Sequence, residues 1–307
     1  MISRRWQQGQ IVSGLSSKKW KEALEGYLFI SPWLLGLILL QLGPMLLSLY
    51  ISFFDWDFFR TPRFIGVRNY TWLFQNDLFW TSLRNTGTYV VGQVSLVTMS
   101  AFTIAVLLNQ KIPFRNFLRT AYYLPSVTPS IAMLMLWVML FETDWGLINL
   151  ALGVVGISPG PNWLGSSQWA MPALILTTIW GLGGAMIIYL AGLQGVPESL
   201  YEAADLDGAN IIQKVWNVTL PLITPVIFFN LVMGVIGSFQ VFNSAYIMTG
   251  GGPGYATFVY VLYLYRQAFM FFRMGRGTAM AWLLLLILLT FSYIMFKRSS
   301  WVYYEAS

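Results

Sequence analysis

The chain has 307 residues, of which 57% are hydrophobic, 17% aromatic and only 10% charged. A soluble domain carries about 25% charged residues, so this chain cannot cover a water-facing surface and must have lipid as most of its solvent. It has no Cys and no His, which excludes disulfides, thiolate chemistry and the commonest metal ligand and general base, and its net charge of +6 is too sparse and scattered for a nucleic-acid surface.

Six apolar runs are long enough to cross a membrane, because a spanning helix needs about 20 mostly apolar residues. They lie at residues 27–54, 86–108, 119–141, 170–193, 222–247 and 279–296. The first starts too late and lacks a cleavage site of small residues, so we interpret it as a retained helix and not a signal peptide. The sequence therefore predicts an all-α polytopic membrane protein with six transmembrane helices.

Prolines occur inside two of the runs, Pro32 and Pro44 in the first and Pro125 and Pro129 in the third. A proline in a spanning helix leaves a carbonyl without its N–H partner and kinks the helix. Ordinary kinking is the simpler interpretation, and a hinge or a lined cavity is the functional one.

The distribution of Lys and Arg predicts the orientation. An even number of spans places both termini on the same side of the membrane. Eleven of the 18 cations then lie on that side and the remaining seven lie on the other. The larger group is Arg4, Arg5, Lys18, Lys19, Lys21, Lys111, Arg115, Arg119, Lys214, Lys297 and Arg298. Since cytoplasmic loops are enriched in cations, both termini are expected in the cytoplasm.

The expected organisation follows from these spans. It comprises a cytoplasmic segment at 1–26, a first transmembrane helix at 27–54, an extracytoplasmic loop at 55–85, a core of five helices at 86–296 that includes a cytoplasmic loop at 194–221, and a cytoplasmic tail at 297–307.

The loop at 194–221 is polar and acidic. Pro197 suits the first turn of a helix, Gly208 can end that helix in a left-handed conformation, and residues 210–216 suit a second short helix. An amphipathic linker lying on lipid is expected to be rich in Lys and Arg, whereas this loop sets four acidic residues against Lys214 alone. The pattern therefore favours a helix–turn–helix that fits a socket on another protein.

The loop also carries a motif. Glu202-Ala203-Ala204 is followed at fixed distances by Gly208 and by Leu220-Pro221. This pattern resembles the EAA loop of type I importer permeases in the ATP-binding-cassette (ABC) superfamily, with Val218 where isoleucine is usual. Residues 64–86, 119–125, 162–165 and 248–257 are similar to the carbohydrate-uptake branch of that family, so the resemblance covers residues 27–296.

The resemblance implies a type I ABC importer permease fold and a division of labour in the cytoplasmic membrane. A homologous second permease subunit would complete a heterodimer, two cytoplasmic ATP-binding subunits would supply the energy, and an extracytoplasmic solute-binding protein would deliver a sugar. By that analogy Glu202 pairs with a basic group of the ATPase and Gly208 makes the turn. The residues implied in coupling are Glu202, Ala203, Ala204, Asp205, Gly208, Ala209, Asn210, Ile211, Ile212, Leu220 and Pro221.

The chain shows no sequence feature that would let it drive transport by itself, neither an ATP-binding motif nor a proton relay. No lysine follows a glycine-rich phosphate loop, and the glycines at 250–254 are expected to form a flexible turn on the outer side. The spans hold no ionisable residue at mid-depth of the kind that a proton-driven carrier keeps. We therefore expect a transport subunit, not an enzyme, with no catalytic residue, cofactor or metal site.

A polar, uncharged solute needs aromatic faces and hydroxyl or amide partners. The fifth run offers Gln240 and Asn243 on one helical face, and the family places solute contacts largely in this helix. Interhelical hydrogen bonding is the alternative role for such side chains. The predicted pathway residues are Thr178, Trp180, Ser238, Phe239, Gln240, Phe242 and Asn243.

Two other functions stay open at this point, whereas a membrane enzyme is excluded for want of His, Cys or a convergent pair of carboxylates at membrane depth. A glycerol-phosphate permease is expected to place a cation in its pathway, and the spans show none at depth. A self-sufficient carrier or channel would give solute flux in liposomes that contain this chain alone.

Overall fold

The computed structural model describes residues 3–302 of the chain, with side chains described from Lys19 onward. Within this range the regular secondary structure is helical apart from one two-stranded pair, β1 with β2. Three helices are long and apolar enough to cross a membrane, and three bent helix pairs raise the number of spans to six. The fold is therefore that of an all-α membrane protein, as the sequence predicts.

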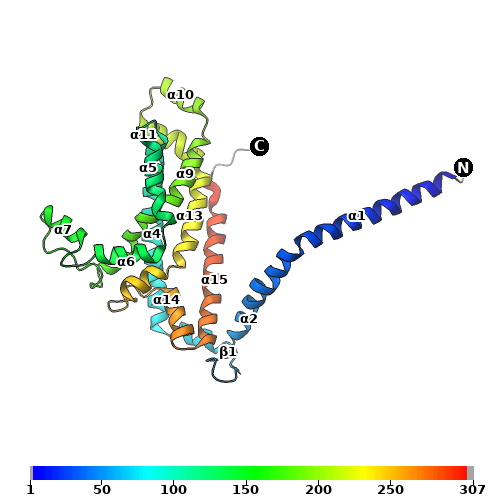
Figure 1. Ribbon diagram of the computed structural model, residues 1–307, viewed down its shortest axis with the longest axis horizontal. Coiled ribbons are helices and arrows are strands. Elements are labelled where there is room, and N and C mark those ends of the chain that lie inside the picture. The colour runs from blue at the N-terminus through cyan, green and yellow to red at the C-terminus, as the bar shows by residue number, and fades with distance from the viewer. Residues whose placement is uncertain (1–2, 303–307) are drawn as a thin grey trace.

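The first span is an arm that leads away from the rest of the molecule (Figure 1). It consists of α1 (Ser3–Gly36), the π-helical turn η1 (Leu37–Leu42) and α2 (Gly43–Ile51). Its apolar part, Lys19–Ile51, is 0% buried within the chain. The arm meets the bundle near its end, where the Trp282 indole N–H donates to the Ser48 hydroxyl at 3.1 Å.

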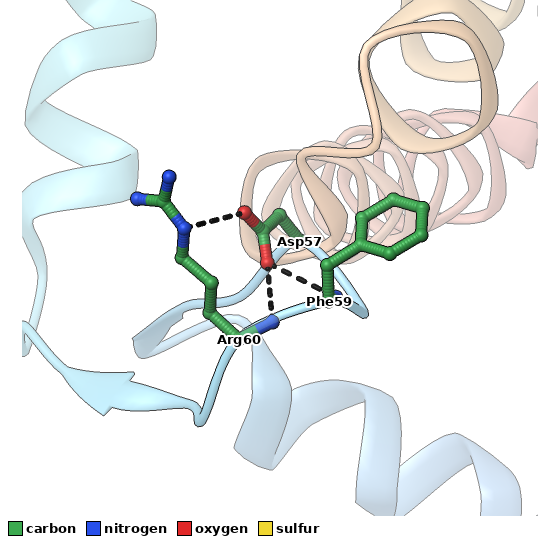
Figure 2. A network of polar contacts seen from close by, with 3 residues as sticks. All are labelled: Asp57, Phe59 and Arg60. Carbon is green, nitrogen blue, oxygen red and sulfur yellow. Dashed lines mark hydrogen bonds and ion pairs between the residues drawn. The ribbon is translucent and has the colours of Figure 1, made fainter.

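A small antiparallel hairpin follows the arm and was not predicted. It joins β1 (Phe54–Asp55) to β2 (Arg63–Phe64). Figure 2 shows its turn, where the Asp57 carboxylate accepts from the backbone N–H groups of Phe59 at 3.1 Å and Arg60 at 2.9 Å. The Arg60 guanidinium lies 3.7 Å from the same carboxylate. These contacts close the loop that precedes the bundle.

The bundle is built around α4 (Asp77–Asn109), which packs along α9 (Gly183–Gln194) and α13 (Thr224–Phe239). Asn76 caps its start by accepting from the Leu78 N–H at 2.9 Å, so the helix begins nine residues before the predicted run at 86. Ala101 and Ala105 are fully buried in a cluster with Tyr189. Small residues at this contact let α4 and α9 approach closely.

The third, fourth and fifth spans are bent helix pairs. The bends measure 100°, 50° and 71° respectively. The pairs are α5 (Arg115–Tyr123) and η2 (Leu124–Val127) with α6 (Ser130–Leu140), α8 (Ala170–Leu176) and η3 (Thr177–Gly181) with α9, and α11 (Ile211–Lys214), η4 (Val215–Thr219) and α12 (Leu220–Leu222) with α13. Pro125 and Pro129 flank the sharpest bend, which is the kinking that proline predicts.

An unpredicted helix, α7 (Leu147–Val154), lies between the third and fourth spans and projects from the bundle beyond α6 (Figure 1). Asn149 fixes it by donating to the carbonyls of Thr143 and Pro161, both at 3.0 Å. Its oxygen accepts from the Trp163 indole at 2.8 Å. Leu147, on the same helix, is 64% exposed, so α7 presents an uncovered apolar surface.

The remaining elements cover the two ends of the bundle. At one end lies α10 (Glu198–Leu206), with α11 beside it (Figure 1). The sixth span, α15 (Met274–Lys297), runs toward that same end and is followed by η7 (Ser299–Trp301). The opposite end holds α3 (Arg68–Phe74), η5 (Ala245–Thr249), α14 (Tyr260–Tyr265) and η6 (Arg266–Met270).

Gly275 generates a stability prediction, because a Cβ at this position would collide with the carbonyl oxygen of Phe54. Gly275→Ala should lower the free energy of unfolding by about 1–3 kcal/mol, since α15 must shift away from β1. The apparent midpoint of thermal unfolding in detergent measures the effect. Gly184→Ala is the matched control, because nothing lies within 4 Å of its Cβ position. Equal midpoints for the two variants would contradict the prediction.

Candidate functional site

The polar segment between α9 and α13 forms a helix–turn–helix at one end of the bundle. Its first helix, α10, starts after Pro197 and places Glu198 in the first turn. Gly208 follows with φ of +74°, a conformation that side chains disfavour, so glycine is required there. The Asn210 side chain then caps α11 by accepting from the Gln213 N–H at 2.9 Å, while the Gln213 side chain accepts from the Asn210 N–H at 2.8 Å.

The second helix of this segment is longer than predicted. The sequence predicts a short helix at 210–216, whereas helical structure continues from Ile211 to Leu222 and bends by 71° into α13. Leu220 and Pro221 form α12, at the far end from Gly208. These two predicted coupling residues therefore lie next to the bend and not on the exposed turn.

Two polar contacts link the two arms of the hairpin formed by residues 198–219. Lys214 on α11 forms an ion pair with Asp205 on α10. The Tyr201 hydroxyl shares a hydrogen bond of 2.9 Å with Thr219, which is 3% exposed. Both contacts cross the Gly208 turn, so the hairpin is a braced unit and not a loose loop. Asp205, one of the residues implied in coupling to the ATPase, is thus engaged within the chain.

The outer surface of the hairpin is apolar and uncovered. Leu206 is 92% exposed, and Ile211, Ile212 and Trp216 are between 64% and 69% exposed. Glu202 and Ala203 are also exposed, while Ala204 and Ala209 are half-buried. Within the described residues, the ion pairs are Asp57 with Arg60 and Asp205 with Lys214, so the Glu202 carboxylate stays without a cation. An apolar patch beside a free carboxylate is a surface that suits a protein partner.

The second candidate site is an open cavity of about 430 Å³ in the bundle. It is lined by residues of four segments: α4, the bend of the third span with α6, η3, and the stretch after α13. The lining residues are Tyr89, Pro125, Ser126, Thr128, Ser130, Met133, Leu134, Trp137, Thr177, Thr178, Trp180, Gly181, Gln240, Val241, Phe242, Asn243 and Ser244.

The fifth span breaks at this cavity, which corrects the expectation of one continuous helical face. The α-helix α13 ends at Phe239, and residues 240–242 are not helical before the chain coils again toward η5. Ser238 and Phe239 consequently lie away from the cavity. Ser238 donates to the carbonyl of Gly234 at 2.7 Å, and the Phe239 ring packs 5.2 Å from Phe291. Five predicted residues line the cavity, namely Thr178, Trp180, Gln240, Phe242 and Asn243.

Hydroxyl side chains satisfy the backbone where the spans are interrupted. Ser126 donates to the carbonyl of Tyr123 at 2.6 Å. Thr177 and Thr178 donate to carbonyls three residues earlier at 2.7 and 2.6 Å. These bonds replace part of the helical hydrogen bonding that bends and 3₁₀ turns disturb. The same residues present their polar atoms near the cavity wall.

The chemistry of the lining suits a neutral polar molecule. Its polar members are hydroxyls and amides, and none is Asp, Glu, Lys or Arg. Trp137 and Trp180 meet edge to face with ring centroids 6.1 Å apart. The described residues contain no group of three or more Asp or Glu that could hold a metal ion.

The glycine-rich turn at 250–254, which the sequence predicts to be flexible, is held by several hydrogen bonds at and beside it. Asn85 donates to the carbonyl of Tyr255 at 2.7 Å, and Arg266 donates to that of Gly250 at 2.6 Å. The hydroxyls of Thr249 and Thr257 lie 2.6 Å apart across the turn. The turn follows η5 directly, so it forms a fixed edge beside the cavity-lining stretch.

Comparison with known proteins places these features in a family. Residues 83–299 match the family described as binding-protein-dependent transport system inner membrane component. The chain is 43% identical over 291 residues to the probable ABC transporter permease protein YesP of Bacillus subtilis (strain 168), covering 93% of this chain and 94% of that protein.

Two other relatives carry names with a solute. The trehalose/maltose transport system permease protein MalF of Thermococcus litoralis is 34% identical, with 93% and 97% of the two chains covered. The arabinooligosaccharides transport system permease protein AraP of Bacillus subtilis is 35% identical, with 89% and 88% covered. A chain of a bacterial alginate ABC transporter crystal structure has the same fold, with a TM-score of 0.81 at 24% identity over 92% of this chain and 96% of that one.

The bracing of the hairpin can be tested by Tyr201→Phe, which removes only the hydroxyl that bonds Thr219. Because one such hydrogen bond contributes about 0.5–1.5 kcal/mol, amide hydrogen exchange across 211–219 should become about two- to tenfold faster. Tyr50→Phe, at a position 61% exposed on the N-terminal arm, is the matched control. Unchanged exchange in Tyr201→Phe would show that the bond does not brace the hairpin.

Proposed function

The chain belongs to the binding-protein-dependent transport system inner membrane components, and from this premise we propose that it forms, with a homologous second permease chain, the pathway of a sugar or oligosaccharide. It is a multi-pass transport subunit of the cell membrane and not an enzyme. Membership of the family brings a solute-binding protein and ATPase subunits as partners, which supply the solute and the energy that this chain lacks.

The cavity supports a sugar as solute. Carbohydrate hydroxyls need hydrogen-bond partners and flat apolar faces, and the lining supplies Gln240 and Asn243 amides beside the Trp180 ring. The relatives named for maltose and arabinooligosaccharides agree with this class. A phosphorylated solute is disfavoured, because no Lys or Arg lines the cavity to neutralise it.

The uncovered apolar surfaces support a second permease chain. No residue of the helical arm Lys19–Ile51 is fully buried, although the end of the arm contacts α15. The α7 helix exposes Leu147 and Leu150 by 64% and 54%. A homologous chain would cover surfaces of this size in the membrane and close the open side of the cavity, and we propose a heterodimer of two such chains.

The exposed surface of the hairpin carries the proposed coupling to the ATPase. Residues Glu202, Ala203, Gly208, Asn210, Ile211 and Ile212 lie on or beside the Gly208 turn and would enter a cleft of the ATPase. Ala204 and Ala209 would keep the two arms close. Leu220 and Pro221 would act at the bend that leads into α13, passing on the movement of the hairpin.

Glu202→Lys tests the coupling role. The reversed charge should repel the basic group proposed on the ATPase, so solute-stimulated ATP hydrolysis by the complete complex in proteoliposomes should fall about tenfold or more, as expected for loss of a charged hydrogen bond. Insertion of the chain in the membrane should not change. Glu22→Lys, an equal charge change on the exposed N-terminal arm, is the control. Full stimulation in Glu202→Lys would argue against this role.

Trp180→Ala tests the solute pathway. A stacking face contributes about 0.5–1.5 kcal/mol to binding. Without it, solute uptake at a subsaturating solute concentration should fall about two- to tenfold. Binding of the solute to the solute-binding protein should stay constant. Ser238→Ala provides the control, because this hydroxyl bonds within its own helix and lies off the cavity. If both variants transport like the wild type, the cavity is not the pathway.

A further inference from the structure

The segment that joins α4 to α5 is cationic and has no acidic residue. Residues 109–123 contain Lys111, Arg115 and Arg119 and neither Asp nor Glu. Arg115 and Arg119 stand one turn apart on α5, so their guanidinium groups share a face of the helix and repel each other. These cations contribute to the predicted orientation of the chain, and the proposed transport function assigns them no role.

These cations lack an anion in the described part of the chain. The ion pairs there are Arg60 with Asp57 and Lys214 with Asp205. Arg119 donates through Nη2 to the carbonyl of Leu108 at 2.9 Å, but its Nε is buried without a hydrogen-bond partner. A guanidinium with a free N–H and a neighbouring cation is a ready receptor for a phosphate oxygen.

Two exposed aromatic side chains accompany the cations. Phe114 is 81% exposed and Phe117 is 70% exposed. Residues 111–117 bound an open hollow of about 660 Å³. Cations next to uncovered phenyl rings match the boundary between lipid headgroups and acyl chains, where charge meets phosphate and the rings meet hydrocarbon.

The position of the segment agrees with that boundary. The α5 helix begins the third span and lies toward the end of the bundle that carries α10 and α11 (Figure 1). This placement rests on the proposed coupling: if the hairpin at 198–219 meets the ATPase, that end of the bundle faces the cytoplasm. The segment at 111–119 therefore lies at the level of the cytoplasmic headgroups.

We propose that Lys111, Arg115 and Arg119 bind the phosphate of an anionic phospholipid of the cytoplasmic leaflet, with Phe114 and Phe117 inserted beside its acyl chains. An acidic protein surface would satisfy the charges but would leave both rings in water. The lipid site does not depend on which solute the complex transports, so it can fail while the transport function holds.

The test uses the complete complex in phosphatidylcholine nanodiscs that contain a photoactivatable phosphatidylglycerol. The lipid should crosslink to residues 109–123 of this chain. Lys111→Gln combined with Arg115→Gln should weaken this labelling about thirtyfold, since each cation near the surface contributes about fivefold to anionic lipid binding. Arg119 is left in place because it also holds Leu108.

A control variant, a variant of one aromatic residue and competition by inorganic phosphate decide the outcome. Arg68→Gln with Arg84→Gln removes two exposed cations at the other end of the bundle and should leave the labelling unchanged. Phe117→Ser should weaken labelling although every charge is kept, whereas a plain phosphate site would be indifferent to it. Unchanged labelling in the Lys111/Arg115 variant, equal loss in the control, full competition by inorganic phosphate, or crosslinking of the segment to the ATPase instead of the lipid would overturn the proposal.

Discussion

The structure depends on one constraint, which is that backbone N–H and C=O groups inside a bilayer must find partners within the protein. A continuous α-helix meets this constraint, but the α-helical spans are interrupted at 125–130, 177–181 and 240–244. Residues of all three segments line the same cavity. Irregular backbone at membrane depth is tolerated where it is enclosed by protein or borders water. All three interruptions therefore border one polar cavity. The hydroxyls that bond the free backbone carbonyls there also make the cavity wall polar.

The helical hairpin at 198–219 and the cavity belong to the same length of chain. From Ile211 the helix runs through the 71° bend into α13, and α13 ends where the cavity wall begins at Gln240. Ile223, at the bend, is 1% exposed and packs in the cluster of α4 and α9. We propose that the braced hairpin, the packed bend and the irregular stretch act in series, so that a displacement of the hairpin would rearrange the cavity wall.

Hydropathy and turn chemistry predicted the six spans and the hairpin, because both are local properties of the chain. The break after Phe239 could not be predicted in this way, since no proline or glycine stands at 239–244 and the polar Gln240 and Asn243 there fit a continuous helical face as well as a break. The contributions of Tyr89 and Trp137 to the cavity were missed for a different reason, because they come from separate spans that only the tertiary packing brings together. The glycines at 250–254 suggested flexibility, but Arg266 donates to the carbonyl of Gly250 and Asn85 donates to that of Tyr255 next to the turn, and neither contact can be read from the local sequence. Leu220 and Pro221 belong to a motif whose residues the folded chain divides between a turn and a bend.

The absence of charged side chains from the cavity wall has an electrical consequence. Moving one elementary charge through the membrane potential involves about 2.3 kcal/mol per 100 mV. A neutral solute that passes a wall of hydroxyls, amides and indoles carries none, and the wall itself has no gating charge to displace. For the neutral solute proposed above, passage through this chain would be electrically silent, so a change of membrane voltage would not change the driving force on the solute.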